Sequence, residues 1–184
     1  AVWPWGEYLG EGALEKGVEV QTSSWTRHHP NISPTKSKAA GNYLNSVLAK
    51  MEAVENGYVE SIMLTPDGYV AEGTGENLFL VRDGEIYTPP TADVLEGITR
   101  DSVITIAEDL GYDVHIEKIT RDQIYISDEA FFSGTAAEVT PIRKIDRRKI
   151  SDKKGPITDE IQNTYLDAVS GKVDRYNQWL HPVE

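Results

Sequence analysis

The chain has 184 residues, of which 39% are hydrophobic and 26% charged; it contains no cysteine and carries a formal net charge of -12 at pH 7. A chain of this size can bury a substantial core, and none of its apolar runs approaches the length that crosses a bilayer. The acidic charge argues against nucleic-acid binding, which needs a basic face. The lack of cysteine excludes disulfides, thiolate nucleophiles and cysteine metal sites, and fits a cytoplasmic location.

The first half of the sequence predicts a strand, a loop, a helix and a meander of strands. The strand is expected over 18–25, and turn signals at 66–68 and 83–84 divide residues 60–90 into short strands. Between them, apolar residues at helical spacing predict an amphipathic helix. They are Ala39, Ala40, Tyr43, Leu44, Val47, Leu48 and Met51.

The second half mixes helices and strands without the strict alternation of a parallel βαβ fold. The predicted elements are a helix over 97–112 that ends at Gly111, a strand over 113–120, a short helix or turn over 121–128, a pair of strands over 129–146 and a final helix over 158–180. This order predicts an α+β domain. The adjacent histidines at 28 and 29 are read as solvent-exposed, and no metal site is predicted.

Two lysines precede the first long helix, although the positive end of the helix dipole disfavours a cation there. A lysine must be neutral to act as a nucleophile, and both burial and a helix N-terminus lower its pKa. Lys38 is therefore a candidate for a Schiff base with a carbonyl cofactor, whereas a surface lysine is the plainer interpretation. Tyr43, five residues on, could point into the same cavity or belong to the core.

Three glycine-containing stretches are further candidates for binding. The first, "EGTGEN", begins at Glu72 and lacks the third glycine of a dinucleotide motif, so it is either a strand bulge or a carboxylate facing a ligand. The second, "EGITRD", starts a helix at Gly97, where exposed N–H groups could bind phosphate or Thr99 could simply cap the helix. The third, "SGTAAE", is either a tight turn or a stretch of small side chains that leaves room for a substrate.

Six segments occur in an order that resembles one family. They are "PWGEYLG", "SSW", "PTKSKAAGNYLNS", "EGTGENLF", "TPPTADVLEGITRD" and "FFSGTAAEVTPI". Together they resemble the C-terminal catalytic domain of branched-chain amino-acid aminotransferases, which use pyridoxal 5'-phosphate and belong to fold type IV. The resemblance implies a D-amino-acid-aminotransferase-like large domain, in which mixed strands form a pseudo-barrel with flanking helices. It also implies transfer of the amino group of L-leucine, L-isoleucine or L-valine to 2-oxoglutarate through a pyridoxal-phosphate Schiff base.

The resemblance implies a role for each matching residue. Lys38 would hold the cofactor and act as the catalytic base. The other implied cofactor contacts are Tyr43 on the phenolic oxygen, Glu72 on the pyridine nitrogen, Leu95 on the ring, and Gly97, Ile98, Thr99 and Thr135 on the phosphate. The implied substrate contacts are Trp5, Tyr8, Thr135 and Ala136, with Tyr8 reaching into the neighbouring subunit of a dimer.

The family also has a smaller N-terminal domain, which has no counterpart in this sequence. Residues 1–184 are therefore expected to be the large cofactor-binding domain of a longer protein, with amino acids and 2-oxo acids as small-molecule partners and an even-numbered homo-oligomer as its assembly. Three alternatives stay open. They are a D-amino-acid aminotransferase, an aminodeoxychorismate lyase, and an inactive half-domain of a nicked enzyme.

Overall fold

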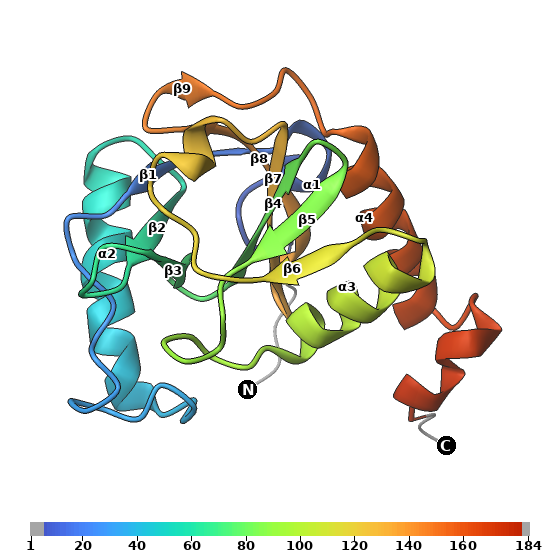
Figure 1. Cartoon of the computed structure of the whole chain (residues 1–184), viewed down its shortest axis with the longest axis horizontal. Coiled ribbons are helices and arrows are strands. Elements are labelled where there is room, and N and C mark those ends of the chain that lie inside the picture. The colour runs from blue at the N-terminus through green and yellow to red at the C-terminus, as the bar shows by residue number, and fades with distance from the viewer. Residues whose placement is uncertain (1–5, 182–184) are drawn as a thin grey trace.

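Nine strands form one mixed, strongly curved sheet in the computed structural model, which describes residues 6–181 (Figure 1). The strands are β1 (Val18–Thr22), β2 (Glu60–Leu64), β3 (Val70–Gly73), β4 (Asn77–Arg82), β5 (Glu85–Thr88), β6 (Val114–Ile116), β7 (Glu129–Gly134), β8 (Glu138–Ile145) and β9 (Arg148–Lys149). Their order is β3-β2-β1-β8-β7-β4-β5-β6, and β9 pairs with β8. β1 runs parallel to both its neighbours, β5 and β6 are also parallel, and the other pairs are antiparallel.

The helices flank this sheet. The α-helices are α1 (Ala13–Lys16), α2 (Tyr43–Glu55), α3 (Ile98–Asp109) and α4 (Pro156–Val169), and the 3-10 helices are η1 (Ala40–Asn42), η2 (Gln123–Tyr125) and η3 (Asp174–Trp179). α2 lies at one end of the sheet, and α3 and α4 cover another part of it (Figure 1). The predicted α+β class with a curved, barrel-like sheet is confirmed.

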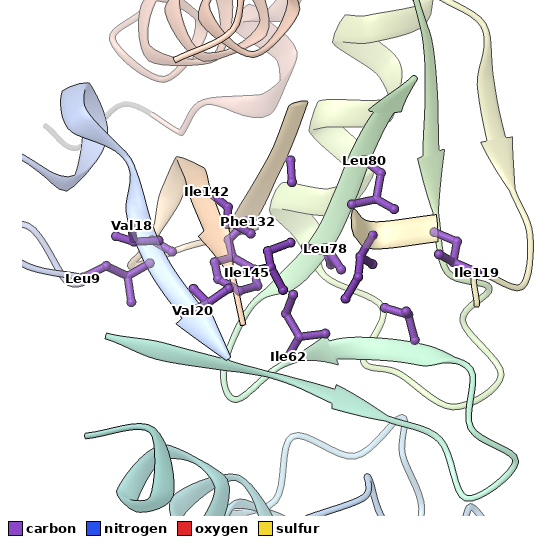
Figure 2. Packing of buried hydrophobic residues seen from close by; sticks show 14 of the residues in the cluster. Leu9, Val18, Val20, Ile62, Leu78, Leu80, Ile119, Phe132, Ile142 and Ile145 are labelled. Atoms are coloured by element: carbon purple, nitrogen blue, oxygen red, sulfur yellow. The ribbon is translucent and has the colours of Figure 1, made fainter. Parts of the chain in front are cut away.

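Strand alternation produces two separate hydrophobic clusters. On β4, Leu78 and Leu80 point into the first cluster, in which Figure 2 shows Ile62, Leu78 and Phe132 close to one another. The next residues along, Phe79 and Val81, point to the opposite face and pack under α3 and α4. Because successive side chains of a strand alternate between faces, a strand buried on both sides reads as a continuous apolar run.

Most predicted elements are confirmed, and the predicted turns are too. Gly68 and Gly84 both have positive φ, and Asp83 shares that conformation in the β4–β5 hairpin, as a tight turn requires. α3 ends where predicted, with Gly111 at φ 91°. The strands predicted over 18–25 and 113–120 are shorter than expected, because β1 ends at Thr22 and β6 spans three residues.

Two predictions about the helices are wrong. The single tail helix over 158–180 is divided, since α4 stops at Val169. Gly171 takes a positive φ of 71°, and the Lys172 N–H donates to the Asp167 carbonyl at 2.9 Å, the bond of a left-handed helix stop. The chain then continues into η3.

The predicted apolar face of α2 does not face the core. The buried residues are the small ones, Ser46, Ala49 and Ala53, which let the helix approach β2 closely enough for Ser61 Oγ to donate to the Ala49 carbonyl at 3.0 Å. The larger apolar side chains on the other face stay exposed: Leu44 67%, Val47 49%, Met51 53% and Val54 61%. Close packing of the helix on the strand therefore favours small side chains over large apolar ones at this contact.

No helix within residues 6–181 is both long and apolar enough to cross a membrane. In the same residues, no group of three or more histidine, aspartate or glutamate side chains is placed to hold a metal ion.

Candidate active site

A cavity of about 850 Å³ opens where several connections of the fold meet. Its walls come from the segment before α1, the loop from Arg27 to Tyr43, the β3–β4 connection, the start of α3 and the β7–β8 tip. Every predicted site residue that the structure describes lines it: Tyr8, Lys38, Tyr43, Glu72, Leu95, Gly97, Ile98, Thr99, Thr135 and Ala136. Trp5, the remaining predicted residue, lies outside the described residues.

Lys38 sits on a loop just before η1 and is exposed rather than buried. The burial on which the sequence interpretation relied is therefore not found in this chain. The loop itself is anchored on both sides of Lys38, because Asn42 Nδ2 donates to the carbonyls of Pro34 at 3.0 Å and Ser37 at 2.9 Å. Tyr43 follows as the first residue of α2, so the helix start fixes its position relative to the loop.

The lysine upstream is held in a different way. Lys36 Nζ forms an ion pair with Glu96 at 3.0 Å and donates to the carbonyl of Thr91. Thr35 Oγ1 adds a hydrogen bond to the Ala92 carbonyl at 3.3 Å. Lys36 therefore ties the lysine loop to the segment before α3, and its amine is already engaged there.

Glu72 is a buried carboxylate at the end of β3. Its Oε1 accepts from Arg27 Nε at 2.8 Å, and its Oε2 accepts from Asn77 Nδ2 at 3.3 Å and from the Leu95 N–H at 3.2 Å. Burial raises the pKa of Glu72 to about 7, and this outweighs the opposing effects of Arg27 and of the hydrogen bonds. The side chain is thus fixed in position and changes charge near neutral pH.

The N-terminus of α3 faces the same cavity. Its N-cap is Gly97, and Thr99 lies inside the first turn, so the alternative that Thr99 caps the helix is wrong. A Cβ at position 97 would clash with Asn77 Oδ1, which explains the glycine. The first N–H groups of a helix have no intrahelical acceptor, so they can bind an anion.

The β7–β8 tip forms the wall beside this helix start. Thr135 and Ala136 are exposed at the tip, whereas Ser133 on β7 is fully buried and lies opposite Asn77 in the strand register. Ser133 Oγ has no hydrogen-bond partner among the described residues. This hydroxyl is enclosed by the protein and is not exposed to the cavity.

Sequence reasoning missed the residues that support Glu72 from other segments. Arg27 is buried although it sits in a loop beside two histidines, and Asn77 links Glu72 to the Leu95 carbonyl with a 3.0 Å bond. His28 is half-buried, not solvent-exposed as predicted. Asn77 lies within the quoted "EGTGEN" motif, but the sequence alone does not predict its hydrogen bonds to Glu72 and Leu95.

A mixed, curved sheet whose connections gather a lysine, a tyrosine, a buried glutamate and a free helix N-terminus around one cavity is an architecture suited to binding an anionic carbonyl cofactor. The sequence model for class IV aminotransferases matches residues 3–145. The chain belongs to the class IV aminotransferase family.

Particular relatives are similar over almost the whole chain. A branched-chain-amino-acid aminotransferase of Pseudomonas aeruginosa is 53% identical over 97% of this chain and 59% of its own length. The branched-chain aminotransferase of the archaeon Thermoproteus uzoniensis, solved with norvaline, superposes with a TM-score of 0.94 at 49% identity, over 100% of this chain and 60% of that one. The branched-chain amino acid aminotransferase of Thermobaculum terrenum in its PLP form superposes with a TM-score of 0.89 at 45% identity, over 91% of this chain and 55% of that one. The chain therefore spans less than two thirds of the relatives it matches.

Proposed function

We propose that this chain is the large cofactor-binding domain of a branched-chain amino-acid aminotransferase that is completed by a smaller N-terminal domain. The proposed reaction transfers the amino group of L-leucine, L-isoleucine or L-valine to 2-oxoglutarate. The observation that carries the proposal is the cavity lined jointly by Lys38, Tyr43, Glu72 and the start of α3. The relatives' names support the substrate class, and their greater length supports the additional domain.

The residues present fit pyridoxal 5'-phosphate. An anionic phosphate suits the free N–H groups at Gly97, Ile98 and Thr99, and the Thr135 hydroxyl lines the same cavity. The half-buried Leu95 offers an apolar surface for a ring. When bound, this cofactor supplies an electron sink that stabilises negative charge at the substrate Cα.

The protein would contribute positioning and proton transfer. Lys38 Nζ would bind the cofactor and, once released, take the proton from the substrate Cα and return it. Arg27 and Asn77 hold Glu72 in place. In its ionised form, Glu72 would keep a proton on the nitrogen of the cofactor ring. The Tyr43 hydroxyl would bond the phenolic oxygen. Tyr8, Trp5, Thr135 and the Ala136 backbone would contact the substrate.

A half-reaction on the full-length protein loaded with pyridoxal 5'-phosphate tests this proposal. L-leucine and D-alanine are added separately while the visible absorption of the bound cofactor is followed. Loss of that absorption with L-leucine and not with D-alanine is the expected result. A response to D-alanine alone would favour the D-amino-acid branch of the family, and a protein that develops no cofactor absorption would contradict the cofactor assignment.

We further propose that the full-length protein forms a homodimer or a higher even oligomer. The support is the exposed apolar row on α2, formed by Leu44, Val47, Met51 and Val54, because contiguous exposed apolar surface often marks an interface. Replacing Val47 and Met51 by glutamate should shift sedimentation velocity toward smaller species. Unchanged sedimentation would exclude this row from the interface.

A further inference from the structure

The connection between β5 and α3 is held at several points by side chains from other segments. Residues 89–96, the connecting segment, lie in neither a helix nor a strand. Side chains that bond to their backbone come from both neighbouring and distant parts of the chain: they are Thr35, Lys36, Glu72, Asn77 and Arg100. Because these bonds replace those of regular secondary structure, the path of the segment depends on the side chains that make them.

Lys36 joins the connecting segment to the loop that carries Lys38. Its Nζ donates to the carbonyl of Thr91, bonds the carbonyl of Val94 at 3.5 Å and forms an ion pair with Glu96 at 3.0 Å. The two charged side chains are 45% and 65% exposed, and an exposed ion pair adds little stability by itself. The contact is therefore defined mainly by the bonds to main-chain carbonyls.

A second side chain strengthens the same contact. Thr35 is 3% exposed, and its Oγ1 donates to the Ala92 carbonyl at 3.3 Å. Lys38 follows Lys36 by two residues, so its backbone lies within about 7 Å of the contact even where the chain is fully extended. The loop cannot shift relative to the connecting segment without breaking these bonds.

The connecting segment is also bonded to the buried carboxyl of the cavity. The Leu95 N–H donates to Glu72 Oε2 at 3.2 Å, and Asn77 Nδ2 bonds both that oxygen, at 3.3 Å, and the Leu95 carbonyl, at 3.0 Å. Burial raises the pKa of Glu72 to about 7, and the positive charge of Lys36 is one of the effects that oppose this rise. A continuous series of bonds thus leads from the Lys38 loop through Lys36 and Leu95 to Glu72.

We propose that Lys36 is a positioning residue that fixes the Lys38 amine relative to the Glu72 carboxylate by clamping the loop onto the connecting segment. This inference rests on the proposed function, in which Lys38 moves the Cα proton and Glu72 faces the ring nitrogen of the same cofactor. Both groups must fit one rigid ring, and a misplacement of about 1 Å can lower a reaction rate about a hundredfold. Lys36 therefore affects the rate of the reaction more than the affinity for the substrate.

The first measurement needs neither cofactor nor turnover. Hydrogen–deuterium exchange of the full-length protein is followed in residues 91–97, whose sequence is the same in every variant. Lys36→Met removes the donor and should make the Leu95 amide exchange several-fold faster, whereas Lys36→Arg keeps donors and should exchange like the wild type. Lys172→Met is the matched control, because it removes an exposed ion pair with Asp167 and does not line the cavity, so exchange should be unchanged.

The second measurement is the L-leucine half-reaction of the loaded full-length protein in a single turnover, recorded at several L-leucine concentrations. In Lys36→Met the rate constant at saturation should fall about tenfold or more, whereas the half-saturating concentration should change by less than about threefold. Lys36→Arg should restore most of the rate. Thr35→Val removes the second bond without changing any charge, so it should lower the same rate constant by a smaller factor, and it decides the question if Lys36→Met does not fold.

Three results would overturn the inference. They are unchanged exchange in Lys36→Met, faster exchange with an unchanged rate constant, and a defect that appears only as a higher half-saturating concentration, which would make Lys36 a substrate contact. A wild-type protein that does not react with L-leucine, while Lys36→Met shows the faster exchange, contradicts the proposed function and supports the clamp. The two failures can therefore be told apart.

Discussion

Arg27→Met removes the cation beside Glu72 while leaving the carboxyl in place. Glu72 keeps its hydrogen bonds from Asn77 Nδ2 and the Leu95 N–H, so the change acts on charge more than on position. Arg27 Nε lies 2.8 Å from Glu72 Oε1, and both side chains are buried. Opposite charges about 4 Å apart at an effective dielectric of about 20 attract by about 4 kcal/mol, roughly a thousandfold in proton affinity.

Even a change of about a hundredfold, which allows for partial screening, would move the pKa of Glu72 from about 7 to about 9. Because the raised pKa leaves Glu72 neutral below it, the rate of the L-leucine half-reaction should rise with pH through about 7 in the wild type. In Arg27→Met this rise should move to about pH 9. At pH 7.5 the ionised fraction of Glu72 would fall from about three quarters to about 3%, slowing the half-reaction about 25-fold.

The assay is single-turnover decay of the cofactor absorption in full-length protein, recorded from pH 5.5 to 10. Arg27→Lys is the matched control, since it retains the charge and should keep the rise within about one pH unit of the wild type. A pH profile for Arg27→Met that superposes on the wild type would refute the electrostatic role of Arg27.

Three further predictions concern the lysine, the anion site and the scaffold. Lys38→Ala should abolish the half-reaction because the lysine two residues upstream is engaged elsewhere; substantial remaining turnover would exclude Lys38 as the base. Gly97→Ala should weaken pyridoxal phosphate binding by about tenfold or more, because the new Cβ meets Asn77 Oδ1, and titration of the cofactor absorption would show an unchanged Kd if this is wrong. Glu129→Gln should lower the free energy of unfolding by about 1–3 kcal/mol, because the carboxylate accepts from the Thr158 N–H at 2.7 Å at the start of α4. Urea denaturation measures that loss, and the rate of the half-reaction should stay unchanged.

The site could be predicted from sequence wherever one short segment supplies the geometry. Lys38 and Tyr43 flank a helix start, and Gly97 to Thr99 begin another, so local spacing places them. The pairing of Arg27 with Glu72 could not be predicted because the two residues are 45 positions apart, and only the packed fold brings them together.

The fold showed the same division between local and long-range information. Turn glycines such as Gly111 end elements through their own backbone conformation, and the sequence therefore predicts them well. The spacing of apolar residues in α2 predicted a helix but did not predict which face of it packs. The contact with β2 is made by the small residues Ala49 and Ala53, and Leu44 stays exposed. Hydrophobic patterning does not report how closely two backbones approach.

Reductive trapping tests directly whether the Lys38 amine holds the cofactor. Full-length protein loaded with pyridoxal 5'-phosphate is reduced with borohydride, digested and mapped by mass spectrometry. We expect a phosphopyridoxyl group on Lys38, with Lys36 unmodified. A label on Lys36 or Lys50, or on no lysine of this chain, would contradict it.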